Sequence, residues 1–458
     1  MRKRWSLLAA VLLVLSLAFG GSGCRREEPT IEHVVLVSVD GLMPASYLEP
    51  DRYGLRVPTL RRMRNEGAYS EGMLSVFPSL TYPAHTTMVT GVPPGRHGIV
   101  TNLAWDPLGR NQGGWRWYAA DIRVPTLWQV AYAKGLRTAM VWWPVTVGAQ
   151  ATALLPEYWR ASTAEDAKLL RALSTPGLLE AVEKKFAGFS ERFLAPFKDD
   201  ETVTDVAVYM LETLRPHLLL LHMAQVDHWQ HEAGPLAEPA RQAIENADRQ
   251  IARLIEAAER AGLWEKTALI VASDHGFAPT TRQVRPGVWL REKGLLTLDA
   301  EGRVTDWRAV VVAHSGSAFV YVRDEQDATT QAEVLELFRT AAARPENGIA
   351  RLYTREDIVA LGGDPEAFLA LEAAPGFALK SGYAGEVVRT VAVRGEHGYP
   401  PAQEAMRAAL LIYGPAIGAG RINNARMIDL APTIAAWLGL PFAHAEGRPL
   451  ELPQRNPR

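Results

Sequence analysis

Short apolar runs alternate with amphipathic stretches along the chain from residue 31 onward. Five runs have the length and composition of buried strands: residues 33–39, 137–143, 218–223, 267–272 and 408–413. Between residues 238 and 261, apolar residues recur every three or four positions, which places them on one face of a helix. A further helix is expected at residues 431–438. Strands that alternate with helices predict an α/β fold with a largely parallel central sheet and helices on both faces.

Two segments, at about 144–200 and 276–396, show a less regular pattern. We interpret them as insertions that cap the C-terminal edge of the sheet. No internal repeat, low-complexity tract or Ser/Gly linker divides the rest of the chain. Residues 31–450 are therefore predicted to form a single domain with two insertions.

The first 24 residues have the layout of an export signal. Basic residues precede an apolar run at 5–19, which is shorter than the roughly 20 residues that span a bilayer, and small residues lead to Cys24. This resembles a bacterial lipoprotein signal, with a signal peptide at 1–23, lipid attachment at Cys24 and a short tether at 24–30. Gly21 departs from the usual pattern, so a cleaved secreted chain and a retained anchor are the alternatives. We expect the remaining chain in the cell envelope, lipid-anchored and facing the periplasm or the cell exterior.

Composition narrows the chemistry that the chain can perform. The 458 residues are 48% hydrophobic and 22% charged, which is typical of a globular protein. Lysine and arginine (49) nearly balance aspartate and glutamate (51), so no basic excess indicates a nucleic-acid partner. The single cysteine can form neither an internal disulfide nor a thiolate metal cage. A metal would therefore have to be bound by histidines and carboxylates.

Three aspartates and three histidines lie just beyond the ends of apolar runs. They are Asp40 after the first run, Asp227 and His231 after the third, Asp274 and His275 after the fourth, and His397 after a further run at 387–393. Singly, such residues are often turns or caps. Together they predict a site at the sheet edge where α/β proteins bind ligands. Imidazole with carboxylate suits Zn²⁺, and six or seven ligands fit two such ions.

Thr81 is the candidate nucleophile. It can cap a helix whose first turn holds Pro83, a position where the missing N–H of proline is tolerated. A hydroxyl there faces the positive end of the helix dipole, which favours a phosphate or a deprotonated oxygen. The local pattern is equally that of an ordinary structural cap. Thr81 becomes a nucleophile only if metals lie beside it, because a metal lowers the pKa of the hydroxyl.

These motifs resemble, in sequence order, the nucleotide pyrophosphatase/phosphodiesterase (type I phosphodiesterase) family of the alkaline phosphatase superfamily. The resemblance runs from about residue 31 to residue 445. Residues 37–41 (VSVDG) resemble the segment of the first metal aspartate, residues 77–85 (FPSLTYPAH) the nucleophile segment, and residues 97–102 (HGIVTN) the segment whose asparagine contacts a phosphoryl oxygen. The resemblance implies an alkaline-phosphatase-like fold and one catalytic domain.

The resemblance also implies two Zn²⁺ ions and a role for each motif residue. One ion would be held by Asp227, His231 and His397, and the other by Asp40, Asp274, His275 and the Thr81 oxygen. Thr81 would attack phosphorus opposite the leaving oxygen, and water would then hydrolyse a phospho-threonine intermediate. Asn102 and the backbone N–H next to Thr81 would donate to a non-bridging oxygen. Tyr82 corresponds to an aromatic residue that stacks on a base or head group, although it is as readily a core tyrosine.

Two positions bear on the substrate, which is expected to be a small phosphodiester or nucleotide. Ala84 stands where many nucleotide-cleaving members have asparagine. Around Trp143, a substrate-binding candidate, the sequence resembles the family's aromatic-Trp-Pro stretch, whereas related monoesterases have a Lys-x-Arg pair that binds the extra charged oxygen. The missing pair favours a diester. The alternatives are a phosphate monoesterase, a phosphonate or sulfate ester hydrolase, and a catalytically inactive lipoprotein that serves as a binding module; the oligomeric state is open.

Overall fold

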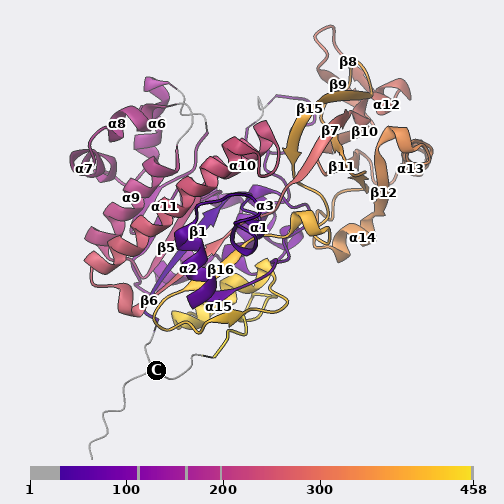
Figure 1. The fold of residues 1–458 in the computed structure, drawn as a ribbon. Helices are drawn as coiled ribbons and strands as arrows, with labels where there is room; N and C mark the ends of the chain where they lie inside the picture. The colour runs from indigo at the N-terminus through magenta and orange to yellow at the C-terminus, as the bar shows by residue number, and fades with distance from the viewer. Residues whose placement is uncertain (1–30, 111–113, 160–162, 196–198, 455–458) are drawn as a thin grey trace, which may run out of the picture.

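A mixed eight-stranded sheet forms the centre of the computed structural model, which describes residues 31–110, 114–159, 163–195 and 199–454 (Figure 1). Its order is β17-β2-β16-β6-β1-β5-β3-β4. The strands are β1 (His33–Val39), β2 (Ala68–Tyr69), β3 (Thr138–Val141), β4 (Ala153–Leu155), β5 (Leu218–Met223), β6 (Thr267–Ala272), β16 (Leu410–Tyr413) and β17 (Gly420–Arg421). Cys24 lies outside the described residues.

The predicted α/β fold is confirmed, with one difference in the direction of a strand. β6, β1, β5, β3 and β4 are mutually parallel, and the expected strands 33–39, 218–223 and 267–272 match β1, β5 and β6. β16 instead runs antiparallel to both β6 and β2. An apolar run fits a buried strand in either direction, so its composition could not reveal this.

Helices cover both faces of the sheet because side chains of the parallel strands point alternately to the two sides. Val35 and Val37 of β1 belong to one core, and Val34 and Leu36 belong to the other. The first core includes side chains from α2 (Pro58–Glu66), α6 (Ala164–Leu173), α7 (Leu178–Lys185), α8 (Phe189–Leu194), α9 (Asp200–Leu214), α10 (Gln225–Ala233) and α11 (Glu238–Arg260). The second includes α3 (Thr81–Thr90), α5 (Leu127–Ala133) and α15 (Leu430–Trp437).

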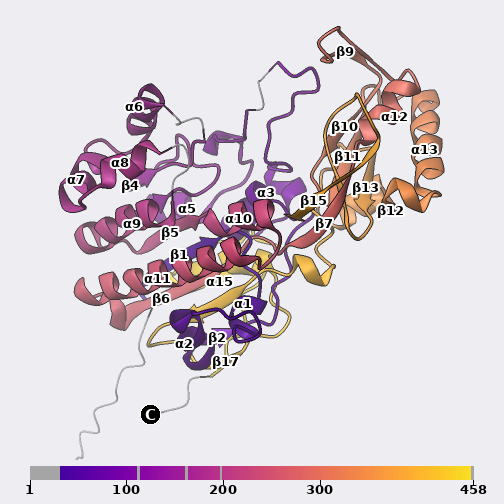
Figure 2. The same cartoon turned by 45° about the horizontal axis from the view of Figure 1, so that its top comes forward.

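Residues 278–396, which we call the cap, build a second body beside the central sheet (Figures 1 and 2). Three small sheets form it: β7 (Ala278–Val284) with β14 (Phe377–Leu379) and β15 (Val388–Glu396); β10 (Ala309–Ala313), β11 (Ser317–Val322), β13 (Leu369–Ala373) and β12 (Ile349–Thr354); and β8 (Leu296–Leu298) with β9 (Val304–Trp307). Its helices are α12 (Pro286–Glu292), α13 (Ala328–Ala342) and α14 (Arg355–Ala360). The cap has its own apolar core, and β7 and β15 connect it to the central sheet.

The two segments that looked irregular in sequence therefore contain regular elements. Residues 144–200 hold β4 and the helices α6, α7 and α8. The cap strands belong to three small sheets, and β9 and β15 are largely exposed or half-buried, so these two strands lack the continuous apolar runs of the central strands. Two short helices, α1 (Ala45–Leu48) and α4 (Pro94–His97), complete the part of the fold near the site. Among the described residues, no helix is long and apolar enough to cross a membrane.

Candidate active site

The ends of the central strands and the end of β15 meet at one cavity. Asp40 follows β1, Asp227 and His231 lie on α10 after β5, and Asp274 and His275 follow β6. His397 follows β15 and so comes from the cap side of the molecule, not from a strand of the central sheet as the sequence pattern suggested. The cavity has a volume of about 590 Å³, and Thr81 and Asn102 line it together with Asp40, Asp227, His231 and His397.

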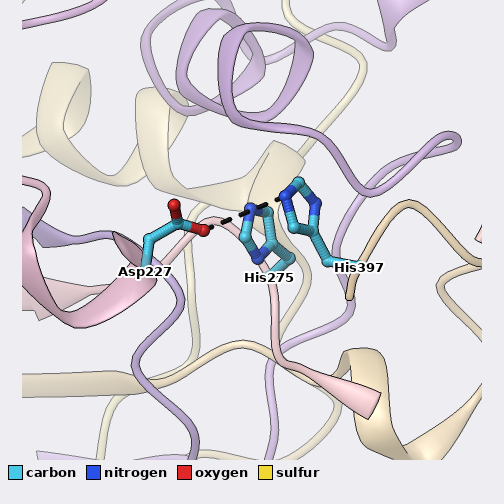
Figure 3. Close-up of side chains that lie close together, drawn as sticks. All are labelled: Asp227, His275 and His397. Carbon is cyan, nitrogen blue, oxygen red and sulfur yellow. Dashed lines mark ion pairs between the residues drawn. The ribbon is translucent and has the colours of Figure 1, made fainter. Parts of the chain in front are cut away.

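The carboxylates and imidazoles form two overlapping clusters. Asp227, His275 and His397 offer ligand atoms that all lie within 4.8 Å of one another (Figure 3). The ligand atoms of Asp40, Asp274 and His275 lie equally close together. The Nε2 atom of His275 lies 3.1 Å from Asp274 Oδ2 and 3.4 Å from Asp40 Oδ1, and its ring stacks on that of His397 at 3.6 Å. The structure thus brings together the predicted ligands, with His275 shared between the clusters.

Hydrogen bonds orient the outer ring nitrogens of two histidines. His231 Nδ1 lies 2.9 Å from the Gly395 carbonyl, and His397 Nδ1 lies 2.9 Å from the Ser79 carbonyl. A carbonyl only accepts, so each ring carries its proton on Nδ1 and presents the Nε2 lone pair, as metal-binding histidines do. His231 Nε2 lies 3.5 Å from Asp227 Oδ1, which is consistent with the expected pairing of these two residues on α10.

Asp40 and Asp274, the two carboxylates of the second cluster, each have one oxygen that accepts hydrogen bonds from the protein. The other oxygen of each has no hydrogen-bond partner among the described residues. Asp274 Oδ1 accepts from the backbone N–H groups of Gly41 and His275, and Asp40 Oδ2 lies 3.0 Å from His222 Nε2. Asp40 Oδ1, Asp227 Oδ1, Asp274 Oδ2 and His275 Nε2 are all buried, and none has a hydrogen-bond partner in the described part of the chain. Buried polar atoms are nearly always satisfied, so four such atoms in one place fit a bound cation.

The charges of the cluster support the same interpretation. Burial and the neighbouring carboxylates of Asp274 and Asp227 raise the pKa of Asp40 well above its ordinary value, and burial raises the pKa of Asp227 to about 6. Burial lowers the pKa of His275 and of His397 well below the ordinary value. Both rings are therefore uncharged and can offer a nitrogen lone pair to a metal ion. A divalent cation would hold the carboxylates in the charged form, and this mixture of imidazole and carboxylate suits Zn²⁺.

Thr81 lies at the start of α3, but it is not the capping residue that the sequence suggested. Leu80 is the N-cap, with extended backbone, and α3 begins at Thr81 without a side-chain cap bond. Thr81 is thus the first residue of the helix, and it lines the cavity at the helix N-terminus. His85 Nδ1 lies 2.8 Å from the Thr81 carbonyl and braces this turn of the helix.

Asn102 is held by the backbone next to Thr81. The Tyr82 N–H donates to Asn102 Oδ1 at 2.9 Å, which leaves the Nδ2 amide as the donor end of the side chain. This bond also uses the backbone N–H that was expected to assist Asn102 at a phosphoryl oxygen.

Tyr82 and Trp143 do not line the cavity in this structure. Both side chains are 0% exposed; Tyr82 packs on Trp115 within an aromatic cluster, and Trp143 packs edge-on against His85. The prediction that they contact substrate is not supported by this geometry. Trp115 and Trp159 line the cavity in their place.

Sequence reasoning missed a buried chain behind Asp40. His222 lies between Asp40 Oδ2 at 3.0 Å and Glu157 Oε2 at 2.6 Å, and all three side chains are buried. The one available signal was a histidine inside the apolar run of β5. His314, on the β10–β11 turn, and Lys380, which follows β14, also line the cavity.

Comparison with known proteins agrees with these observations. The model of the type I phosphodiesterase/nucleotide pyrophosphatase family matches residues 34–400. The chain belongs to this family. Human ectonucleotide pyrophosphatase/phosphodiesterase family member 1 is 25% identical over 254 residues, 53% of this chain and 23% of the relative. Venom phosphodiesterase 2 of Crotalus adamanteus is 25% identical over 53% of this chain and 26% of its own length.

Solved structures of similar proteins cover most of this chain. Murine ectonucleotide pyrophosphatase/phosphodiesterase 5, as an inactive variant in complex with AMP, superposes with a TM-score of 0.65 at 20% identity and covers 91% of this chain and 97% of that one. The human protein of the same name gives a TM-score of 0.63 at 20% identity, over 89% and 95% of the two chains. The expected alkaline-phosphatase-like fold is confirmed. The curated relatives are longer: the match spans about a quarter of the human and venom proteins.

Proposed function

We propose that this protein hydrolyses phosphodiester or pyrophosphate bonds, preferably in nucleotide-type substrates, through a phospho-threonine intermediate on Thr81. The observation that carries the proposal is that Thr81, the first residue of α3, lines the same cavity as Asp40 and Asp227, whose carboxylates each have a buried oxygen without a hydrogen-bond partner among the described residues. Membership of the family supports the same chemistry. So does the AMP complex of the murine neighbour, which shows that this fold can hold a nucleotide.

The residues divide into metal-holding and substrate-holding groups. We infer two Zn²⁺ ions, one on Asp227, His231 and His397 and one on Asp40, Asp274, His275 and the Thr81 oxygen. When bound, such ions lower the pKa of a hydroxyl and stabilise a leaving oxygen. Thr81 Oγ1 loses its proton to solvent and bonds to phosphorus as the bond from phosphorus to the leaving oxygen breaks, while Asn102 Nδ2 donates to a non-bridging oxygen. Water then attacks phosphorus, the bond to Thr81 Oγ1 breaks, and that oxygen is protonated again. Asp274, fixed by two backbone N–H groups, holds His275 in place.

Paired charges in the cavity favour a diester over a monoester. Lys380 Nζ lies 2.6 Å from Glu396 Oε1, and Arg394 Nη1 lies 3.2 Å from Glu232 Oε1. Both lysine and arginine are thus balanced by carboxylates. A dianionic monoester needs an additional cation for its third charged oxygen, whereas a diester with one charge does not.

Replacement of Thr81 tests the proposed nucleophile. Thr81→Val keeps the shape of the side chain but removes the hydroxyl, and it should lower kcat on bis-p-nitrophenyl phosphate by at least about a thousandfold, since nucleophile loss removes the covalent route. Thr81→Ser keeps a hydroxyl and should retain measurable turnover. Wild-type turnover should be faster for the diester than for p-nitrophenyl phosphate. Unchanged activity in Thr81→Val would rule out the threonine intermediate, and a preference for the monoester would favour the monoesterase alternative.

Metal content separates an enzyme from an inactive binding module. Elemental analysis of the purified protein should show close to two zinc ions per chain, and chelation should abolish hydrolysis until Zn²⁺ is returned. A panel of diesters, pyrophosphates and monoesters, assayed with added Zn²⁺, completes the test. If the protein binds no zinc and hydrolyses no member of the panel, it is the inactive binding module.

We also propose that the protein is exported and attached to the membrane through a lipid on Cys24. The support is the signal-like sequence of residues 1–24. Labelling of cells with a radioactive fatty acid should mark the wild-type protein and not Cys24→Ser.

A further inference from the structure

The helix that carries two of the proposed metal ligands begins without a capping side chain of its own. Asp227 and His231 lie on α10, whose N-cap residue, Ala224, makes no side-chain hydrogen bond. The first N–H groups of a helix have no acceptor within the helix, so they need one from outside. Because Asp227 lies in this first turn, a group that accepts from these N–H groups also fixes the backbone of the ligand.

Asp200, the first residue of α9, supplies such an acceptor. Its Oδ1 accepts from the Gln225 N–H at 3.2 Å, and its own N–H donates to Gln225 Oε1 at 3.2 Å. Gln225 is the first residue of α10. A reciprocal pair of bonds therefore joins the starts of two helices, in the pattern of a capping box that here connects two helices instead of lying within one.

The Asp200 side chain does not cap its own helix. Asp199 is the N-cap of α9, and its Oδ1 accepts from the Thr202 N–H at 2.7 Å. Asp200 is fully buried, and its Oδ2 has no hydrogen-bond partner among the described residues. The contact with the start of α10 is therefore what orients the Asp200 carboxyl.

The carboxyl of Asp200 keeps this acceptor whether or not it is charged. Burial raises the pKa of Asp200 to about 7, against the opposing effect of the Gln225 N–H. Oδ1 can accept a hydrogen bond in both the ionised and the protonated form. Asparagine offers the same acceptor without the charge, which makes it the conservative replacement.

Two further contacts define what Asp200 can control. Asn246 Nδ2 of α11 donates to Gln225 Oε1 at 3.0 Å, and α11 packs against both α9 and α10 (Figures 1 and 2). Further along α10, Gln230 Nε2 donates to the Gly41 carbonyl at 2.6 Å. Asp227 lies between these two contacts, and its Oδ1 has no hydrogen-bond partner in the described ranges of the chain. The helix backbone therefore decides where this oxygen lies.

We propose that Asp200 is a positioning residue for the metal site, which fixes the first turn of α10 and with it the Asp227 carboxylate. Asp200 does not line the active-site cavity, so it acts through α10 and not by contact with the ion. The inference rests on the proposed binding of zinc by Asp227, His231 and His397. Its consequence is specific: loss of the Asp200 acceptor weakens this ion and leaves the other ion unchanged.

Zinc affinities of three variants test this role. Asp200→Ala removes the acceptor and should weaken the ion at Asp227 by about tenfold or more, the effect typical of partners that orient a ligand. Asp200→Asn keeps the acceptor and should stay within about twofold of the wild type. Asp199→Ala is the matched control, because it removes the cap of α9 but no bond to α10, and it should leave both affinities unchanged. Chelator competition followed by elemental analysis measures the two affinities.

A double-mutant cycle identifies the affected ion. Asp227→Ala should abolish the same binding step, and Asp200→Ala should then have no additional effect. Hydrogen exchange of the metal-free protein gives a readout independent of zinc: the start of α10 should exchange about tenfold faster in Asp200→Ala and no faster in Asp199→Ala. If Asp200→Ala does not fold, Gln225→Met, which removes the return acceptor, takes its place and should weaken the same ion; unchanged affinity would then overturn the proposal.

The outcomes separate this inference from the proposed function. If the wild-type protein binds no zinc, the proposed function itself fails. If the wild type binds two ions and Asp200→Ala binds both with wild-type affinity, the positioning role is wrong. The role is also wrong if Asp200→Ala weakens both ions equally, if Asp199→Ala weakens the same ion, or if Asp200→Asn loses as much affinity as Asp200→Ala.

Discussion

His222 contacts two buried carboxylates: its Nδ1 lies beside Glu157 and its Nε2 beside Asp40. Burial alone would lower its pKa, but the charges of Glu157 and Asp40, together with hydrogen bonds to both, raise that pKa well above the ordinary value. The ring is therefore a buried cation that holds Asp40 Oδ2 and leaves Asp40 Oδ1 for the site. Its role is to position Asp40, because the ring contacts neither Thr81 nor a reacting atom.

Removal of this ring should cost both stability and metal affinity. His222→Ala leaves Asp40 and Glu157 as unpaired buried charges, so we expect a loss of about 3–5 kcal/mol in the free energy of unfolding, measured with denaturant. Zinc affinity, measured by chelator competition, should fall by about 10–100-fold, the effect typical of partners that orient a ligand. His222→Gln retains a hydrogen bond to Asp40 and should recover part of the affinity. Wild-type zinc affinity in a folded His222→Ala protein would contradict the positioning role.

At the scale of the elements, the turn after β15 depends on Gly398. Its φ is +84°, and a Cβ there would lie 1.9 Å from the His314 carbonyl oxygen. The neighbouring Gly316 N–H donates to the His397 carbonyl, and Gly398 N donates to Ser79 O. The close approach of the β10–β11 turn to this glycine sets the direction of His397.

Alanine at Gly398 should displace His397 and inactivate the enzyme. Gly376→Ala is a matched control, because its φ is +82° and nothing lies within 4 Å of the added Cβ. The control should cost about 1–2 kcal/mol in unfolding free energy from the left-handed backbone alone. Gly398→Ala should cost more and lower kcat/KM by about a hundredfold, since a shift of about 1 Å at a reactive group has that effect. Equal effects of the two substitutions would show that the clash is relieved without moving His397.

The elements also show which parts of the site the sequence could predict. β1, β5 and β6 are continuous apolar runs, so their ends, and with them Asp40, Asp227 and Asp274, could be located from the pattern. β15 pairs with β7 and is half-buried or exposed up to its last two residues, so nothing local shows that it carries His397 to the central sheet. The burial of Tyr82 and Trp143 depends on packing between segments distant in sequence, and it was missed for the same reason.

At the scale of the whole molecule, buried neutral histidines also occur outside the predicted metal ligands, at His85, His97 and His314. Burial lowers the pKa of His85, His97 and His314 to about 3. In the unfolded chain a histidine titrates near pH 6.5. Between these values the unfolded state binds more protons than the native state, so stability is lost as the pH falls below about 6.5.

Acid lability should follow this proton count. Each buried histidine should lower the unfolding free energy by up to about 1.4 kcal/mol per pH unit between pH 6 and pH 4, measured by urea unfolding. His97→Gln should remove one such contribution from the slope. Thr87→Val, which removes the hydroxyl 3.0 Å from His97 Nε2 but no titrating group, should lower stability by a similar amount at every pH. A pH slope in His97→Gln equal to that of the wild type would show that His97 accepts a proton in the native state.

The cap is attached to the central sheet through β7 and β15. This arrangement lets the choice of substrate and the hydrolytic chemistry change independently during evolution. Thr81, the proposed nucleophile, lies at the start of α3, and most of the proposed metal ligands follow strands of the central sheet, whereas the β10–β11 turn and the segment after β14 supply His314, Ser315 and Lys380 to the cavity wall. Substitutions and insertions within the cap can therefore alter which molecule is accepted while the sheet keeps the hydrolytic chemistry unchanged. Substitutions at His397 and Gly398 would affect both properties, because this short segment follows a cap strand and also supplies a proposed metal ligand.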